Sequence, residues 1–206
     1  LEIMNLLGVN EVEPFDYLHR QYEYPVYVHL KGRDLYERKD DGTYNRDNFH
    51  EHPEEYKCSF SPFVKQTDIL LNGVYWDKTI PSLFTLDEFR NPSFKIQTIA
   101  DITNDTGGSI PINIGDSTIA DPVYGVDKIT LQKTAPYLST SVDVMAVGNL
   151  PNELPRDASR YFGEQLIKYV LDDLVKGGSP ILERATMLKA GALTEEYSYL
   201  KEYAGV

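Results

Sequence analysis

The stretch TDILLNGVYW, residues 67–76, decides the fold class, because its apolar residues run together instead of alternating with polar ones. A continuous apolar core without alternation is typical of a parallel strand covered on both faces. FKIQTIADI at residues 94–102 predicts another strand, and VDVMAV at residues 142–147 predicts a further buried strand. The sequence therefore predicts a parallel sheet.

The segments before this stretch predict a helix and two short strands. LEIMNLLGV, residues 1–9, has apolar residues at helical spacing and ends near Gly8. A short strand is expected over 9–13, stopped by Pro14, and YPVYVHL at residues 24–30 alternates like a half-buried strand.

The remaining segments predict further helices around the sheet. Residues 31–62 form a polar excursion with one or two helical turns broken by Pro53, and residues 110–140 are expected to be loosely structured. A short helix is expected to begin in TLDEF, residues 85–89, behind a Thr85–Glu88 capping box. Further helices are expected from Pro155 to the KGG at 176–178, with an apolar stripe, and at 181–190 and 194–203. The order of strands and helices indicates an α/β fold.

The charge of the chain argues against one class of partner. The 206 residues include 32 acidic and 20 basic ones, a net charge of −12. Binding to nucleic acid needs a concentrated basic face, which no window provides, so we expect no nucleic-acid partner.

The single cysteine, Cys58, and the absence of a long apolar run bear on the compartment. One cysteine excludes an internal disulfide, and we read Cys58 as a semi-buried or surface thiol in preference to a catalytic one. No run reaches 18 apolar residues, so we expect no membrane span and a cytoplasmic protein. Because the chain begins with Leu1 and has no signal segment, we expect it to be a piece of a longer protein.

Polar residues and glycines stand where three of the predicted strands end. Ligands of open parallel sheets bind beyond the carboxyl ends of the strands. Glycine allows a close backbone approach, and Asn or Asp supplies hydrogen bonds. The residues in question are Asn72 and Gly73, then Asp101, Asn104, Asp105, Gly107, Gly108 and Ser109, and finally Gly148 and Asn149.

These motifs also have other interpretations. An Asn-Gly pair after a strand is often only a turn. DITNDTGG has the acid spacing of a calcium loop but lacks the terminal glutamate, and His50 and His52 do not share a helix face, so we predict no metal site. No G-x-S-x-G motif is present, and the residues alone assign no catalytic group.

Three stretches together resemble a known family. TDILLNGVYWDKTIPSLFT, IADITNDTGGSIPI and MAVGNLPNELPRDASRYFGEQLIKYVL are similar to the lysine-forming saccharopine dehydrogenases, and more closely to the lysine–ketoglutarate reductase half of the bifunctional lysine-degrading enzyme. YNRDNFHEHPEEY also resembles a segment of that reductase. The resemblance covers residues 1–175 and places the chain with alanine dehydrogenase and the transhydrogenase nucleotide-binding subunit.

The resemblance implies a Rossmann-type parallel sheet flanked by helices, lacking its first strand and its glycine-rich turn in this chain. No G-x-G-x-x-G occurs in the sequence. The implied domains are an N-terminally incomplete dinucleotide-binding domain at 1–155 and, at 156–206, C-terminal helices that pack on a substrate domain upstream of the chain. A chain without that strand is expected not to be self-sufficient.

The resemblance also implies cofactor-binding residues. Glu13 stands near the position of an acid that holds the adenine ribose, with Asp16 as an alternative, and it mildly favours NAD over NADP. The other positions that match the family's motifs are Asn72, Gly73, Val74, Tyr75, Asp101, Asp105, Gly107, Gly108, Gly148, Asn149, Leu150 and Pro151.

Position 148 departs from the family pattern, which has Asp where this chain has glycine. A carboxylate there can hold ribose or a reacting group through charged hydrogen bonds, and glycine cannot. The duty is then lost or moved to another residue such as Asn149.

The function implied is that of the nucleotide-binding part of an NAD(P)-dependent amino-acid dehydrogenase of the saccharopine type, which converts saccharopine reversibly to lysine and 2-oxoglutarate. The implied cofactor is NAD or NADP, and the implied substrate is a small-molecule amino acid. Two alternatives stay open: an alanine-dehydrogenase-like oxidoreductase, and a non-catalytic nucleotide-binding or regulatory module. The upstream domain of the same protein is the expected partner, and a homo-oligomer is left open.

Overall fold

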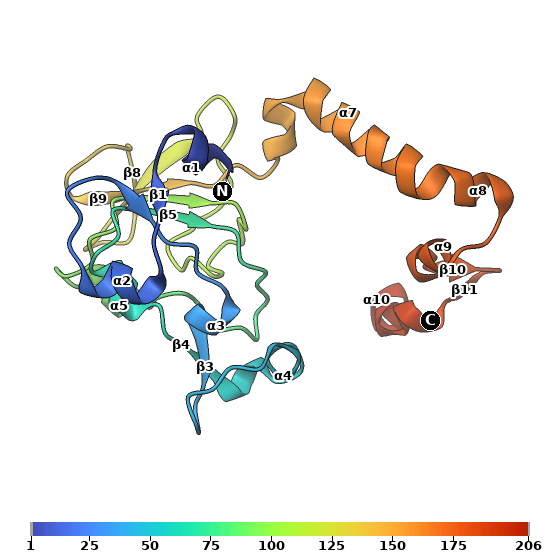
Figure 1. Cartoon of the computed structure of the whole chain (residues 1–206), viewed down its shortest axis with the longest axis horizontal. Helices are drawn as coiled ribbons and strands as arrows, with labels where there is room; N and C mark the ends of the chain where they lie inside the picture. The colour runs from blue at the N-terminus through green and yellow to red at the C-terminus, as the bar shows by residue number, and fades with distance from the viewer. Residues whose placement is uncertain (1, 206) are drawn as a thin grey trace. The chain divides into compact units, whose positions relative to one another are not determined.

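The computed structural model describes residues 2–205, and its contacts divide the chain after Gly148 (Figure 1). The two units, Leu1–Gly148 and Asn149–Val206, are described separately. The predicted helix 1–9 is confirmed as α1 (Glu2–Leu6), and Gly8 with a φ of 69° ends it; Leu1 lies outside the described residues.

A five-stranded sheet forms the centre of the first unit (Figure 1). Its strands, in spatial order, are β5 (Ile69–Asn72), β6 (Thr98–Asp101), β9 (Ser141–Met145), β7 (Val123–Asp127) and β8 (Lys133–Thr134). β5, β6 and β9 are parallel neighbours, whereas β7 pairs antiparallel with both β9 and β8. The predicted α/β, Rossmann-like class is thereby confirmed.

The register aligns the ends of the three parallel strands. Asn72 pairs with Asp101, and Ala100 pairs with Met145. All three carboxyl ends therefore lie at one edge of the sheet, which is where open parallel sheets bind ligands.

The prediction of loose structure over 110–140 is wrong for the β7–β8 hairpin. Tyr124 and Val126 are buried, and Asp127 accepts hydrogen bonds from the amides of Ile129 and Thr130 to form the turn. The Val-Tyr-Gly-Val pattern carries the β-branched and aromatic residues typical of a strand, and an antiparallel edge is common on a parallel sheet.

β5 lies at the other edge and is not covered on both faces as its apolar run predicts. Ile69 is 64% exposed and Leu71 is 53% exposed, whereas Asn72 is buried. An edge strand has only one paired neighbour, so an apolar run in its sequence does not ensure burial.

The segments before β5 pack on the core through α2. β1 (Asn10–Glu11) and β2 (Val26–Tyr27) lie within the two predicted strands and form a separate parallel pair. Pro14, expected only to stop the first strand, is also the first residue of α2 (Pro14–His19), a helix that the sequence does not predict. Tyr17 of α2 stacks on Phe63 and shares a hydrogen bond with Thr67 of 3.0 Å.

The polar excursion has more structure than its sequence predicts. It comprises α3 (Gly32–Leu35), β3 (Tyr36–Arg38), α4 (Arg46–Glu51), η1 (Pro53–Glu55), β4 (Tyr56–Cys58) and α5 (Ser61–Val64). The predicted break at Pro53 is confirmed, and β3 pairs antiparallel with β4. Buried aromatic rings hold this segment against the sheet: Tyr36, Phe49, Tyr56, Phe60 and Phe63 belong to the same core cluster as Ile99 and Val144.

The predicted capping box is also confirmed. Thr85 accepts from the Glu88 amide and Glu88 accepts from the Thr85 amide, at the start of α6 (Leu86–Arg90). Phe89 of this helix is fully buried.

The second unit is mainly helical. After η2 (Leu150–Glu153), a continuous helix is built from α7 (Pro155–Leu166), a π-helical segment η3 (Ile167–Leu171) and α8 (Asp172–Lys176), and Gly177 ends it. The predicted helix and its KGG terminus are confirmed, and its apolar stripe is largely exposed.

The last segments only partly follow the prediction. α9 (Pro180–Ala185) covers the first half of the helix expected at 181–190, but the second half is a hairpin of β10 (Leu188–Lys189) and β11 (Ala192–Leu193). Gly191, with a φ of 82°, favours that turn. η4 (Glu195–Leu200) and α10 (Lys201–Ala204) follow. No helix within residues 2–205 has the length and apolar character needed to cross a bilayer.

Candidate functional site

A buried polar network lies at the carboxyl ends of β5 and β6. Asn72 donates to Asp101 and to Ser109, both at 2.8 Å. Asn113 donates to the other Asp101 oxygen at 2.8 Å. All four residues are 1% exposed. Buried polar groups of this kind are stable only when they are paired, and this set satisfies itself.

The network therefore gives Asn72 and Asp101, two predicted site residues, a structural role. The structure brings Asn72 and Asp101 together, as expected for neighbouring strand ends, but their side chains face the protein and not solvent. They fix the loops above them: Asp101 also accepts from the Asn104 amide at 3.2 Å, and the Asn72 carbonyl accepts from the Ile102 amide at 2.8 Å.

The loop after β5 presents an exposed group. Gly73 and Tyr75 are exposed, and Tyr75 is 72% exposed. Val74 is half-buried, and its carbonyl accepts from the Thr103 hydroxyl at 2.6 Å. The loops after β5 and β6 are thus tied to each other.

The loop after β6 needs glycine at two positions. Gly107 has a φ of 62°, and a Cβ on Gly108 would lie 2.6 Å from the Asp105 Cβ and 3.1 Å from the Trp76 ring. Asp105 itself is half-buried. Gly107 is therefore required by its backbone conformation and Gly108 by close packing.

The turn after β9 brings in a residue that the sequence does not single out. Gly148 is exposed, and a Cβ there would lie 2.9 Å from Oδ2 of Asp116. Asp116 accepts a hydrogen bond from the Asn104 side chain at 2.7 Å. Asn113 and Asp116 stand in INIGDS, whose Gly-Asp-Ser reads as an ordinary turn, so no signal in the sequence connects Asp116 with Gly148.

Tyr124 of β7 adds two further hydrogen bonds to the buried network. Its hydroxyl donates to Asn113 at 3.3 Å and accepts from the Ile114 amide at 3.2 Å. Burial raises the pKa of Tyr124, the Ile114 hydrogen bond lowers it, and the carboxylates of Asp101 and Asp116 raise it further. The phenol therefore stays protonated and remains a donor at neutral pH.

The other predicted residues are placed elsewhere. Glu13 is exposed at the start of α2 beside the small β1–β2 sheet, and no hydrogen bond joins it to the strand-end network within residues 2–205. Asn149 and Leu150 open the second unit, where Asn149 precedes η2. Asp16, the alternative to Glu13, forms an ion pair with Arg20 at 3.1 Å.

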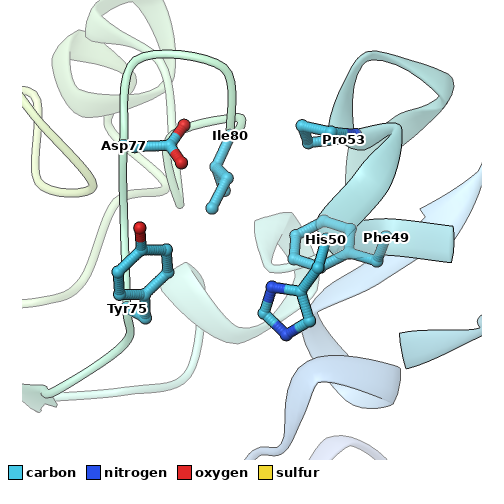
Figure 2. Close-up of a pocket in the computed structure, with 6 residues that line it drawn as sticks. All are labelled: Phe49, His50, Pro53, Tyr75, Asp77 and Ile80. Carbon is cyan, nitrogen blue, oxygen red and sulfur yellow. The ribbon is translucent and has the colours of Figure 1, made fainter. Parts of the chain in front are cut away.

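A pocket of about 380 Å³ borders the loop after β5 (Figure 2). Phe49, Pro53 and Ile80 form its apolar part, and His50, Tyr75 and Asp77 supply polar groups. Hydrogen bonds from Thr79 lower the pKa of Asp77, which therefore keeps its charge at neutral pH. The volume lies within the range of small-molecule sites.

The surroundings of Cys58 disfavour a reactive thiol. Burial raises the pKa of the Cys58 thiol to about 11, and the thiol donates to the Leu83 carbonyl at 3.4 Å. A protonated, half-buried thiol is a poor nucleophile, which agrees with the non-catalytic reading. No group of three metal-ligating side chains occurs within residues 2–205.

Comparison with known proteins gives relatives for most of the chain, although no protein-family model matches it. Mitochondrial alpha-aminoadipic semialdehyde synthase of Mus musculus is 28% identical over 194 residues, which cover 80% of this chain and 21% of the relative. The Arabidopsis thaliana alpha-aminoadipic semialdehyde synthase is 29% identical, covering 83% and 17%. These proteins are homologues of the chain.

A second group of homologues carries a more specific name. The protein named saccharopine dehydrogenase [NAD(+), L-lysine-forming] of Schizosaccharomyces pombe is 30% identical over 128 residues, covering 61% of this chain and 33% of the relative. The predicted resemblance to saccharopine dehydrogenases is confirmed at the level of homology. The chain spans a third or less of the length of these relatives.

Proposed function

We propose that the first unit is the nucleotide-binding part of an NAD(P)-dependent dehydrogenase that acts on saccharopine. The observation that carries the proposal is the shared edge at which β5, β6 and β9 end, with polar loops above it. The homologues named saccharopine dehydrogenase supply the reaction class.

The exposed residues at this edge suit contact with a dinucleotide. A Cβ on Gly73 would meet nothing within 4 Å, so this backbone is open to a ligand, and Tyr75 is exposed beside it. We assign direct cofactor contact to Gly73, Val74, Tyr75, Asp105 and Gly148, and the adenine ribose to Glu13. Asn149 and Leu150 belong to the second unit, and their cofactor contact stays a prediction from the sequence. Asn72 and Asp101 are assigned a supporting role because they are buried. The residues fit ribose and nicotinamide contacts, whereas the sequence contains no glycine-rich pyrophosphate turn.

In the proposed reaction, saccharopine, water and the oxidised cofactor give lysine, 2-oxoglutarate, the reduced cofactor and a proton. The cofactor supplies the hydride acceptor, and the protein contributes orientation and electrostatics. The exposed carboxylates and amides at the edge provide hydrogen-bond acceptors for hydroxyl or ammonium groups.

The test is a turnover assay of the full-length protein, followed at the absorbance of the reduced nicotinamide. Lysine and 2-oxoglutarate are supplied with NADH and, in parallel, with NADPH. Oxidation of either cofactor is expected, and the ratio of the two rates assigns NAD or NADP. No turnover with either one would contradict the saccharopine assignment.

Two further measurements separate the alternatives. Turnover with alanine and NAD(+), but not with saccharopine, would favour an alanine-dehydrogenase-like enzyme. Titration with NADH, read by the fluorescence of Trp76, tests binding without catalysis. Trp76 is half-buried, and its ring would lie 3.1 Å from a Cβ on Gly108 in the loop after β6, so it is placed to report on that loop.

The partners and the compartment belong to the same proposal. We assign a substrate-binding domain of the same protein as the partner of the first unit, because the homologues are several times longer than this chain. Cytoplasmic location and homo-oligomerisation stay predictions, since "mitochondrial" belongs to the name of the animal relatives and not to this chain.

A further inference from the structure

The carboxylate of Asp116 lies close to the backbone of Gly148, and no role has been assigned to it above. Oδ2 of Asp116 lies 2.9 Å, and Cγ lies 3.2 Å, from the position that a Cβ on Gly148 would take. The carboxylate thus occupies the space in front of Gly148 that a side chain on residue 148 would fill. Both residues belong to the first unit and are exposed.

The backbone on either side of this contact is fixed. The Ser117 amide donates to the Ala146 carbonyl at 2.9 Å, and the Ala146 amide donates to the Ser117 hydroxyl at 3.3 Å. Ser117 also forms a parallel bridge with Val147. Asp116 is therefore attached to the end of β9 by its next residue.

The side chain of Asp116 is also held. Asn104, whose φ of 55° is unusual for a residue other than glycine, donates to Oδ1 at 2.7 Å. Asn113 in turn donates to the Asn104 side-chain oxygen at 3.2 Å and to the buried Asp101. A chain of hydrogen bonds therefore runs from the buried network to the exposed carboxylate.

One oxygen of this carboxylate is left for a ligand. Oδ1 accepts from Asn104, whereas Oδ2 has no hydrogen-bond or ion-pair partner within the described part of the first unit. A preorganised, exposed acceptor at the ligand-binding edge of a parallel sheet is suited to a charged hydrogen bond with a hydroxyl or an ammonium group.

We propose that Asp116, whose carboxylate fills the space beside Gly148, binds the ligand at the edge where β5, β6 and β9 end. The inference rests on the proposed dehydrogenase function and deepens it. Oδ2 binds a hydrogen-bond donor of the bound molecules, either a ribose hydroxyl of the dinucleotide or the amino group of the amine substrate. Asn104 is the positioning residue that aims the carboxylate.

The experiment compares D116N, D116A, G148D and the double variant D116A/G148D in the full-length protein. D121N is the matched control, because Asp121 is also an exposed aspartate but lies in the turn before β7, where its amide donates to the Thr118 carbonyl at 3.1 Å. D116N keeps an oxygen for Asn104, removes the charge and replaces the other oxygen with an NH₂ group, so it serves if D116A fails to fold. Thermal melting of each variant accompanies the kinetics.

The expected loss in kcat/KM is about tenfold or more for D116N and D116A, because a charged hydrogen bond is lost. G148D alone is expected to lose activity, since its side chain would collide with Asp116. The double variant moves the carboxylate from residue 116 to residue 148, and it should recover activity to within about threefold of the wild type. A merely structural role for Asp116 would lower the melting temperature of D116A together with its activity, whereas a role in ligand binding lowers the activity alone.

The KM values separate the two donors. A rise confined to the KM for the nicotinamide cofactor assigns the ribose hydroxyl, whereas a rise confined to the KM for the amine substrate assigns the amino group. Activity of D116N within twofold of D121N would overturn the inference while leaving the proposed function in place. A wild-type protein without turnover on any amine substrate would overturn both.

Discussion

Two layers of polar residues at the same sheet edge behave differently. Asn72, Asp101, Ser109 and Asn113 are 1% exposed and hydrogen-bonded to one another, whereas Tyr75, Asp116 and Gly148 are exposed above them. The buried layer builds the edge, and the exposed layer is available to a ligand. Polar residues at strand ends therefore have two distinct duties, and only the upper layer is expected to touch a cofactor.

The sharpest way to break this division is to exchange Asp101 and Asp116 for asparagine in parallel. In D101N, an acceptor oxygen becomes an NH₂ group facing the donors of Asn72 or Asn113, so we expect a loss of about 3 kcal/mol in the free energy of unfolding. D116N is expected to stay within about 0.5 kcal/mol. Urea unfolding of both variants measures the difference, and equal losses would contradict the two-layer description.

The loop glycines give a second, smaller contrast. G108A places a methyl group 2.6 Å from the Asp105 Cβ and 2.9 Å from its backbone oxygen, and we expect a loss of about 2 kcal/mol from overpacking. G73A meets nothing within 4 Å and should leave stability unchanged. Thermal denaturation distinguishes them, and a stable G108A would show that the loop can rearrange.

A third variant sharpens the description of the exposed layer. Y75A removes a ring that is 72% exposed, so we expect no loss of stability but a rise of about tenfold in the Kd for NADH, measured by calorimetry. Y24A, at a tyrosine that is 57% exposed beside β2, is the matched control. Equal Kd values for the two variants would remove Tyr75 from the proposed site.

The smallest expected effect is a shift in a titration. T79V removes the hydroxyl donor to Asp77, the main cause of its lowered pKa, but keeps the amide donor, so the pKa of Asp77 should rise and stay below its ordinary value. A carboxyl whose pKa is lowered by folding stabilises the protein above the unfolded pKa of about 3.9, and this contribution is lost as the pH falls through the folded pKa. NMR titration of the Asp77 carboxyl carbon measures the shift, and an unchanged pKa in T79V would exclude the hydroxyl as its cause.

Local patterns in the sequence predict much of the fold. The runs at 67–76, 94–102 and 142–147 do contain parallel strands, and the Thr85–Glu88 cap and the proline at 155 do begin helices. These features can be predicted because each depends only on residues that are close together in the sequence. The sequence does not predict the β7–β8 hairpin or the turn at Gly191. A single extended segment and a single glycine are weaker signals than a helical or alternating pattern of apolar residues.

The site was only partly predictable for a different reason. That Asn72 and Asp101 meet follows from parallel strands ending at one edge, and the structure confirms that they do. Whether a side chain turns inward or outward depends on the loop above it, which closes through Asn113, a residue with no motif of its own. The contact of Asp116 with Gly148 joins positions 32 residues apart, and no local pattern encodes it.

The closeness of Asp116 to Gly148 matters for how related sequences are compared. The family resemblance leads one to look for an acid at position 148, and a column-by-column comparison would score this chain as having lost it. In three dimensions, a carboxylate oxygen of Asp116 lies 2.9 Å from the position that a Cβ on residue 148 would take, although it comes from another stretch of backbone. Where strands end at a common edge, functional groups are better compared by their position in space than by their position in a sequence alignment.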